Sequence, residues 1–236
     1  MTGSGELAAH VLATSELFAG LHPATLGEVA PSARTRRLPK GTHIFSQGDT
    51  CERAHVLIEG SVRITQTGGG DGEQIIVRFI GPGETFGTVG LFTNGRYPAD
   101  AITLAGSSEA SWSEADLFEL MDRHPRIVAN VIRVIGKRLQ EVQERLRELS
   151  TQRVERRVAH AVLRLARQAS HNTTDGTMIE FPLRRKDVAD ISGTTVHTAS
   201  RILTAWEKDG LLVSRNRCLI ICRPSALLRI AEDSTD

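Results

Sequence analysis

Apolar residues recur at helical spacing in two short runs near the C-terminus, and a glycine separates the runs. In residues 185–191, Val188 and Ile191 are three positions apart and share one face of a helix. Residues 196–208 carry a stripe of apolar residues at the same spacing, formed by Ala199, Ile202, Leu203 and Trp206. The pattern predicts two short helices on a common core. By itself such a pair is an ordinary αα-hairpin, so its interpretation depends on the turn.

The turn between the two predicted helices is typical of a helix-turn-helix. Gly193 can adopt the positive φ of a tight turn, and Thr195 can cap the second helix. Gly210 follows that helix and is a common kind of helix stop. The first turn of the second helix would then reach base edges in the major groove of DNA. We expect DNA contacts at Thr195, Val196, His197, Ser200 and Arg201.

Two strand-like apolar runs, residues 211–213 and 219–221, flank the basic segment 214–217. This pattern predicts a β-hairpin with a basic tip, which together with the preceding helices makes a winged helix. Cations in this region would contact DNA phosphates and position the protein on the duplex. The expected phosphate contacts are Arg184, Arg185, Lys186, Arg215 and Arg217.

A heptad pattern of apolar residues precedes this region, with alternating steps of four and three and charged residues on the other faces. So narrow a stripe favours a two-stranded coiled coil over a helix packed on its own domain. Pro125 suits the start of the helix. A dimer would place two recognition helices one DNA turn apart, about 34 Å. The predicted dimer interface is Val128, Ile132, Ile135, Leu139, Val142, Leu146 and Leu149.

Short strand-like runs separated by glycine turns fill most of the first 110 residues. They are residues 44–45, 56–58, 62–64, 75–80 and 101–104. Their spacing predicts a small barrel or sandwich, preceded by a short helix within residues 15–30. After the heptads, we expect a helix over residues 154–170 and a hinge loop over residues 172–176. The expected class is therefore α+β.

Charge is distributed unevenly along the chain. Residues 1–150 carry 15 Lys and Arg against 18 Asp and Glu, whereas residues 151–236 carry 14 against 10. The positive excess coincides with the predicted winged helix, as attraction to phosphates requires. No apolar run approaches the length of a membrane span, and no signal peptide is evident, so we expect a cytoplasmic protein without membrane contact.

The residues that catalytic or metal sites need are absent as motifs. Cys51, Cys218 and Cys222 are too few and too scattered for a disulfide framework or a four-cysteine metal site. The sequence has no P-loop, no Gly-x-Ser-x-Gly, no metalloprotease histidine pair and no dinucleotide fingerprint, since the glycines of residues 68–72 form a strand-to-strand turn. We expect neither an enzyme nor a metal site.

Several motifs in one order resemble the CRP/FNR family of bacterial transcription regulators. They are residues 55–62, residues 81–84, residues 89–92 and residues 193–203, and the likeness extends over about residues 17–228. It implies a cyclic-nucleotide-binding-like β-roll over residues 1–124, a dimerisation helix over 125–150 and a winged helix over 151–236. It also implies a homodimer on a palindromic operator, RNA polymerase as a partner, and a small effector in the β-roll.

The effector loop departs from the members of the family that bind cyclic AMP. Those members have a glutamate after the first glycine of the run at residues 87–92, and an arginine before a small hydroxyl residue clamps the phosphate. Here Thr88 takes the place of the glutamate and Pro98 that of the arginine. A buried phosphate without a bidentate cation would lose most of its binding free energy. We expect another effector, in a pocket formed by Gly87, Thr88, Val89, Arg96, Tyr97 and Pro98.

Residues 83–87, 96–99 and 197–201 resemble the NnrR and DNR branch of the family, which is linked with nitric oxide and with haem. An iron–sulfur cluster is not expected, because Cys51 is the only cysteine of the first half. Haem remains a candidate cofactor, but the sequence does not single out a residue as its ligand. The histidines of the first half are expected to be exposed or to cap helices; they are His10, His22, His43, His55 and His124.

The reading helix also differs from the Glu-x-x-Ser-Arg pattern of the FNR type, because His197 replaces the glutamate. By resemblance, Arg201 reads a guanine and Ser200 makes a second contact. The half-site should then differ from the FNR sequence at one base pair. Two alternatives remain: a cyclic-nucleotide-responsive activator, and a β-roll signalling protein whose C-terminal module binds protein.

Overall fold

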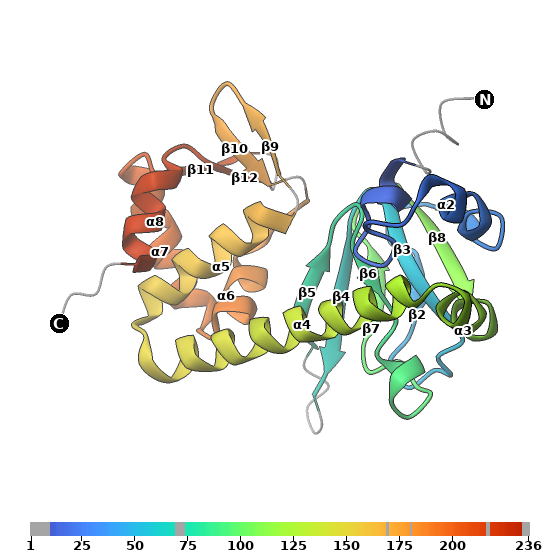
Figure 1. The fold of residues 1–236 in the computed structure, drawn as a ribbon. Coiled ribbons are helices and arrows are strands. Elements are labelled where there is room, and N and C mark those ends of the chain that lie inside the picture. The colour runs from blue at the N-terminus through green and yellow to red at the C-terminus, as the bar shows by residue number, and fades with distance from the viewer. Residues whose placement is uncertain (1–9, 69–73, 169, 180, 216–217, 233–236) are drawn as a thin grey trace. The chain divides into compact units, whose positions relative to one another are not determined.

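The computed structural model describes residues 10–68, 74–168, 170–179, 181–215 and 218–232 (Figure 1). The chain forms two units, one of residues 1–72 and 80–141 and the other of residues 73–79 and 142–236. Strands and helices occur in both units, which confirms the α+β class. None of the helices within the described ranges is long and apolar enough to cross a membrane.

The first part of the chain is a β-roll of two antiparallel sheets with strand orders β1-β8-β3-β6 and β2-β7-β4-β5. Its strands are β1 (Arg34–Leu38), β2 (His43–Phe45), β3 (Arg53–Glu59), β4 (Val62–Thr67), β5 (Gln74–Ile80), β6 (Thr85–Phe86), β7 (Asp100–Thr103) and β8 (Ser107–Ser113). All five predicted strands are present. Strands β1, β6 and β8 were not predicted. Strand β6 has only two residues, and β1 and β8 are rich in arginine and serine and have few apolar residues.

The core of the β-roll forms around Trp112 on β8. The ring of Phe18 packs edge-on against Trp112 at 4.8 Å, and the indole N–H donates to the Val29 carbonyl oxygen at 3.1 Å. Val29 ends helix α2 (Pro23–Val29). The short helix expected in residues 15–30 is confined to α2, because turns that include Gly20 at φ 73° separate it from helical residues 10–14.

Two helices follow the last strand of the roll: α3 (Glu114–Arg123) and α4 (Pro125–Thr151). As predicted, Pro125 is the first residue of the long helix. One face of α4 is anchored by Ile127, Asn130 and Val131, all buried. The Asn130 amide donates to the carbonyl oxygens of Leu17 and Ala19 at 2.9 and 3.0 Å, which satisfies it in the core.

The C-terminal part is a winged helix with sheet order β11-β12-β10-β9. Its elements are α5 (Val154–Gln168), β9 (Ser170–Thr173), β10 (Gly176–Ile179), α6 (Arg185–Ser192), α7 (Val196–Lys208), β11 (Leu212–Arg215), β12 (Cys218–Ile221) and α8 (Pro224–Glu232). The two helices and the wing hairpin are as predicted. The tip residues 216–217 lie outside the described residues.

The expected hinge loop over residues 172–176 is wrong, because these residues belong to the hairpin of β9 and β10 (Figure 1). Strand β9 reads Ser-His-Asn-Thr and lacks the apolar alternation by which a strand is recognised. Gly176 has φ 137°, and a Cβ there would lie 2.2 Å from the Ile221 carbonyl oxygen. Gly176 therefore allows β10 and β12 to approach closely and does not mark a loop.

Candidate nucleic-acid interface and effector site

The reading helix α7 is built by the turn that precedes it. Gly193 ends α6 in the left-handed conformation, with φ 62° and ψ 48°, and its N–H bonds back into that helix. Thr195 then caps α7, its hydroxyl accepting from the Thr198 backbone N–H at 3.2 Å. Both conformations were predicted. Together they fix where α7 begins and which side chains its first turn presents.

The first turns of α7 present side chains that the protein itself does not use. Val196, His197 and Arg201 are exposed, and Ser200 is half-buried. Within the described part of the chain, His197, Ser200 and Arg201 have no hydrogen-bond or ion-pair partner. The opposite face of α7 is buried in the core through Ala199, Leu203 and Trp206. The predicted reading residues thus lie on one preformed, free surface.

The expected phosphate contacts are, by contrast, paired inside the protein. Arg185 binds Glu207 at 2.8 Å, Lys186 binds Asp190 at 3.2 Å, and Arg215 binds Asp175 at 2.9 Å. Arg184 binds Asp187 at 2.9 Å and completes a capping box at the start of α6. Arg217 lies outside the described residues. A phosphate would have to compete with a carboxylate at each described position, and these contacts remain predictions.

The predicted effector residues lie on the loop that follows β6, and the structure separates their side chains. Tyr97 is buried, whereas Val89, Arg96 and Pro98 are exposed. The Arg96 guanidinium donates to the Gly48 carbonyl oxygen at 2.7 Å. Thr88 is half-buried beside the short 3₁₀-helix η1 (Gly90–Phe92). The loop therefore directs the Tyr97 phenol inward, next to position 98, where the cyclic-AMP-binding pattern has an arginine.

Gly87 of this loop can only be a glycine. Its φ is 73°, and a Cβ there would lie 2.8 Å from the Cδ2 atom of His55. His55 lies on β3 and is 2% exposed. The expectation that the histidines of the first half are exposed or cap helices is therefore wrong for His55, although His22 does cap α2 by accepting from the Ala24 N–H.

Aromatic rings fill the interior next to the effector loop. Tyr97 stacks on Phe45, with ring centroids 3.8 Å apart and planes 6° from parallel. His55 stacks on Phe86 at 5.0 Å and approaches Phe45 at 5.6 Å. The Tyr97 hydroxyl donates to the Arg53 carbonyl oxygen at 3.0 Å and lies 3.5 Å from His55 Nε2. The four rings close this part of the roll.

A chain of ionisable groups continues from the rings through the core. His55 Nδ1 lies 3.0 Å from the Glu109 carboxylate, which also accepts from Arg36 Nε at 2.8 Å. Glu109 is fully buried on β8. Burial would raise the pKa of the Glu109 carboxyl, but the hydrogen bonds and charges of His55 and Arg36 hold it below its ordinary value. Glu109 is therefore a buried carboxylate stabilised by its two partners.

At the loop end of this row of ionisable groups, the Cys51 thiol and the Tyr97 phenol are neutral. Burial raises the pKa of the Cys51 thiol, and the same cause, followed by the adjacent Cys51, raises the pKa of the Tyr97 phenol far above its ordinary value. The Cys51 Sγ donates to the Gly87 carbonyl oxygen at 3.2 Å. These hydrogen bonds thus couple the effector loop to β3 and β8.

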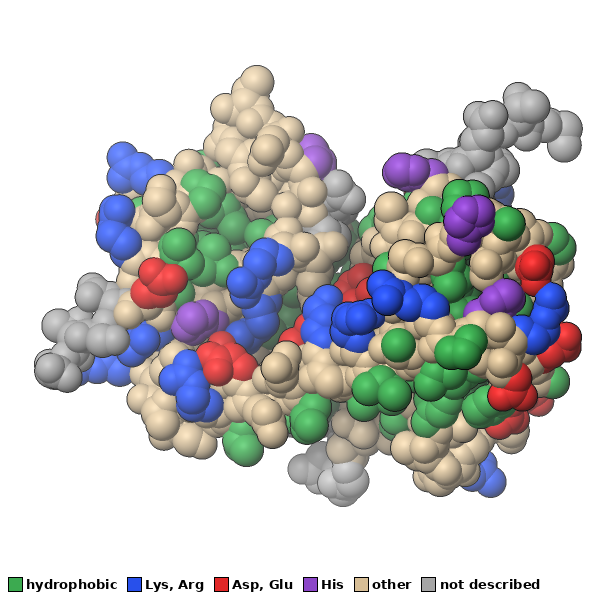
Figure 2. All heavy atoms as spheres, viewed as in Figure 1, with side chains coloured by type: hydrophobic (Ala, Val, Ile, Leu, Met, Phe, Trp, Pro, Cys, Tyr) green, Lys and Arg blue, Asp and Glu red, His purple; other side chains and the backbone are tan. Residues whose placement is uncertain are grey.

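The apolar stripe of α4 is largely uncovered. Val128 is half-buried, and the other six predicted interface residues are exposed by 43 to 65%. In Figure 2, hydrophobic side chains lie along the front of α4 next to a row of Lys and Arg side chains. Leu149 also packs on the turn of α6 and α7, since a Cβ on Gly193 would lie 2.3 Å from its Cδ2 atom. An uncovered stripe of this kind marks an interaction surface.

Sequence reasoning missed the residues that surround the effector loop. Phe45, Phe86, Cys51, Glu109 and Arg36 were not singled out as site residues. Phe45 was an aromatic residue at a predicted strand position, whereas Phe86 lay outside every predicted strand, and nothing in the sequence shows that the two face the same interior. Glu109 lies in a serine-rich strand, 54 positions from His55. A buried charge so far from its partner leaves no local signal.

Comparison with known proteins accounts for both parts of this architecture. A model of the cyclic nucleotide-binding domain matches residues 35–124, and a model of the Crp-like helix-turn-helix domain matches residues 156–230. The cyclic AMP receptor protein of Thermus thermophilus is 33% identical over 199 residues, which cover 84% of this chain and 88% of that protein. The chain belongs to the CRP/FNR family.

Two further relatives show the breadth of the family around this regulator. The transcriptional activator protein FnrA of Stutzerimonas stutzeri is 27% identical over 86% of this chain and 82% of its own length. The structure of FixK2 from Bradyrhizobium japonicum has the same fold, with a TM-score of 0.72 at 21% identity, and covers 84% of this chain and 96% of that one. This CRP/FNR regulator is thus a DNA-binding transcription regulator with a cyclic-nucleotide-binding domain.

Proposed function

We propose that this regulator acts as a homodimer on a palindromic operator and that a small effector other than cyclic AMP controls it through the β-roll. The observation that carries the DNA half of the proposal is the free reading surface of α7, where His197, Ser200 and Arg201 have no partner among the described residues. Arg201 would read a guanine through two hydrogen bonds, and His197 would change one base pair relative to the FNR half-site.

The exposed stripe of α4 supports the homodimer. Six large apolar side chains on one helix face are costly to leave in water, and their heptad spacing suits a second copy of the same helix. Two copies would pair their reading helices at the spacing of one DNA turn. Contact with RNA polymerase follows from the family and stays a prediction.

The effector loop supports an effector other than cyclic AMP. A cyclic phosphate needs a bidentate cation in a buried site. Pro98, which takes the place of the arginine, is exposed, and the next residue, Ala99, has no hydroxyl. Tyr97 fills the interior against Phe45. A buried neutral phenol brings no positive charge to offset the desolvation of a cyclic phosphate monoanion.

Nitric oxide is the effector that the resemblance to the NnrR and DNR branch suggests. Haem does not fit at His55 in this conformation, because the Nε2 atom lies 3.5 Å from the Tyr97 hydroxyl and Nδ1 is on Glu109. Absorbance spectra with added haemin, before and after nitric oxide, test this part. A Soret shift that is lost on His55→Ala would contradict the geometric conclusion about His55.

Effector control would operate through α4. An effector that changes the loop next to β6 would shift the helix between two packings and so change the spacing of the reading helices. The Arg138 guanidinium on α4 supports this route, because it binds Glu16 at 2.7 Å and lies 3.7 Å from Glu84, the residue that precedes β6. These contacts join the helix to the turn before β6, the strand that leads into the effector loop.

The test of the proposal is selection of binding sites from a random DNA library, followed by titration of the selected duplex. We expect a palindromic site, a dimer by light scattering, and unchanged affinity when cyclic AMP is added at millimolar concentration. Binding that shows no sequence preference at any salt concentration would contradict it. If the C-terminal module instead bound a protein, DNA retention would be absent even at low salt.

A further inference from the structure

One carboxylate at the end of the reading helix joins three elements of the winged helix. Glu207, in the last turn of α7, accepts from Arg185 Nη2 with both oxygens, at 2.8 and 2.9 Å. The Ser214 hydroxyl donates to the same carboxylate at 2.5 Å. Arg185 begins α6 and Ser214 lies on β11. Glu207 therefore ties the start of the first helix and the wing strand to the end of α7.

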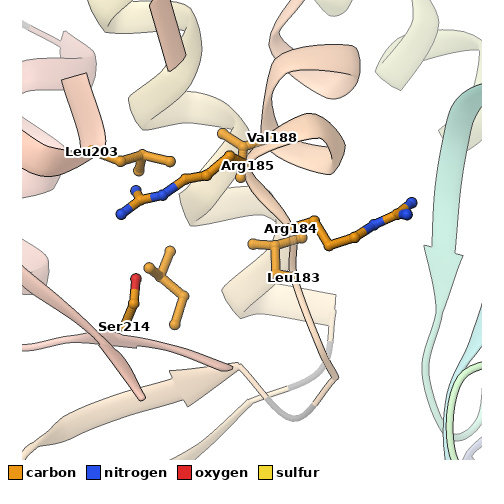
Figure 3. A pocket seen from close by; sticks show the side chains of 7 residues that line it. Leu183, Arg184, Arg185, Val188, Leu203 and Ser214 are labelled. Atoms are coloured by element: carbon orange, nitrogen blue, oxygen red, sulfur yellow. The ribbon is translucent and has the colours of Figure 1, made fainter. Parts of the chain in front are cut away.

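The pair is partly removed from water. The side chains of Arg185 and Glu207 are 32% and 26% exposed. They lie beside a pocket of about 420 Å³ whose apolar lining is Leu183, Val188, Leu203 and Leu219. Figure 3 shows Arg185 extending into this pocket toward Leu203, whereas Arg184 points away from it. Arg185 Nη1 is buried without a hydrogen-bond partner among the described residues. A charge-assisted pair in such surroundings is stronger than one in open water.

The paired cation of the wing, Arg215, is held less tightly. Arg215 and Asp175 are 62% and 49% exposed, so their pair gains little over hydration and can give way to a phosphate. Arg185 would have to leave a half-buried carboxylate and a hydrogen-bonded wing to do the same. Its charge is already neutralised by Glu207 at the surface where DNA would lie.

We propose that Glu207 is a positioning residue for DNA reading: through Arg185 and Ser214 it sets the wing against α7, and Arg185 serves this clamp and not a DNA phosphate. The proposal rests on the proposed function, because it concerns how the DNA-binding surface is held in shape. It assigns Arg185 a role different from that of Arg215, although both were expected as phosphate contacts from the sequence.

The test compares two double alanine substitutions, each of which removes an ion pair and leaves the net charge unchanged. They are called the clamp deletion and the wing deletion. Arg185→Ala with Glu207→Ala removes the clamp, and Arg215→Ala with Asp175→Ala removes the exposed pair of the wing. Each protein is titrated with the selected operator and with a scrambled duplex over a range of salt concentrations, by fluorescence anisotropy. Circular dichroism verifies that the variants are folded.

For the clamp deletion, we expect the salt dependence of operator binding to stay as in the wild type. The ratio of operator to scrambled affinity should fall by about tenfold, comparable to one mismatched base pair. The wing deletion should instead flatten the slope by about 0.9 in log–log form, the value for one lost phosphate contact, and leave the ratio unchanged. Ser214→Ala, at a surface position, should lower the ratio in the same direction but by less.

A slope that flattens by about one in the clamp deletion would show that Arg185 contacts a phosphate and would overturn the proposal. An unchanged ratio in the clamp deletion and in Ser214→Ala would overturn it as well. A wild-type protein that binds operator and scrambled duplex equally would instead refute the proposed function itself.

Discussion

The β-roll interior and the first turns of α7 deal with polar side chains in opposite ways. Around the effector loop, Glu109, His55 and Tyr97 are buried and bind one another or the backbone. On α7, His197 and Arg201 are exposed and, among the residues described, bind nothing. Glu109, His55 and Tyr97 are thus satisfied within the protein, whereas the side chains on α7 remain available for a partner.

This difference shows which site is preformed. A reading helix can meet DNA without rearrangement, since its free donors already point to solvent. An effector that enters the β-roll must first displace the stack of Tyr97 on Phe45 and then replace the hydrogen bonds of the Tyr97 hydroxyl. Its affinity would be reduced by the cost of opening, so the proposed effector site would belong to a second conformation.

The largest effect we expect comes from a charge placed in the exposed apolar stripe of α4. Leu139→Glu should prevent the dimer and, with it, operator binding, at a cost of at least about 10³ in affinity, the usual gap between specific and non-specific binding. Light scattering and footprinting measure the two effects. Gln140→Glu, one position away and also exposed, is the control and should change neither. A monomer that still protects the full palindrome would contradict the dimer.

Next in size is the loss of the buried carboxylate. Glu109→Ala leaves His55 and Arg36 without their acceptor and should lower the free energy of unfolding of the β-roll by about 3 to 5 kcal/mol, as for other broken buried ion pairs. Urea unfolding can be followed by Trp112 fluorescence in a Trp206→Phe background. Glu119→Ala, at a 71% exposed side chain, is the control. A loss below about 1 kcal/mol would place Glu109 with ordinary surface pairs.

A smaller effect is expected on the free side of the comparison. Arg201→Ala should cost about 1 to 3 kcal/mol of operator affinity and relax the preference at one base pair. Repeating the site selection with the variant identifies that base pair. Arg201→Lys keeps the charge but not the two-fold hydrogen bond, so it should retain non-specific affinity and lose the preference. An unchanged selected site would argue against the proposed docking of α7.

The last prediction concerns how the free energy of unfolding changes with pH. The pKa of Glu109 is lower in the folded protein than its ordinary 4.5, so its ionised form adds stability above that pH. This contribution should be lost as the pH falls below 4.5 toward the folded-state pKa. Unfolding free energies measured between pH 6 and pH 3 should therefore decline more steeply for the wild type than for Glu109→Gln. Parallel curves would show that Glu109 is not held ionised by its partners.

The sequence predicted the winged helix well because its signals are local. Gly193, Thr195 and the spacing of Ala199, Leu203 and Trp206 lie within one stretch and specify the turn, the cap and the buried face. The free reading surface followed from these, since whatever is not on the buried face must be exposed. The pairing of Arg185 with Glu207 did not follow, because 22 positions separate the two residues.

The β-roll was predicted only in outline, for a physical reason. Strands with apolar alternation were found, but β1 and β8 are polar and are held as strands by pairing with each other and with β3. Tertiary pairing overrides the low strand propensity of serine and arginine. The cluster of Phe45, His55, Phe86 and Tyr97 comes from four separate segments of chain, so that only the fold shows it.

Helix α4 continues without interruption across residues 141 and 142, where one unit ends and the other begins. Its 27 residues correspond to a rod about 40 Å long. No fragment that stops at this border can therefore end at a natural terminus: either piece would carry a frayed half-helix with uncovered leucine and isoleucine side chains. A separate winged-helix fragment should therefore keep residues 142–151, because Leu149 packs on the turn at Gly193 and Glu148 binds Arg164 at 2.6 Å.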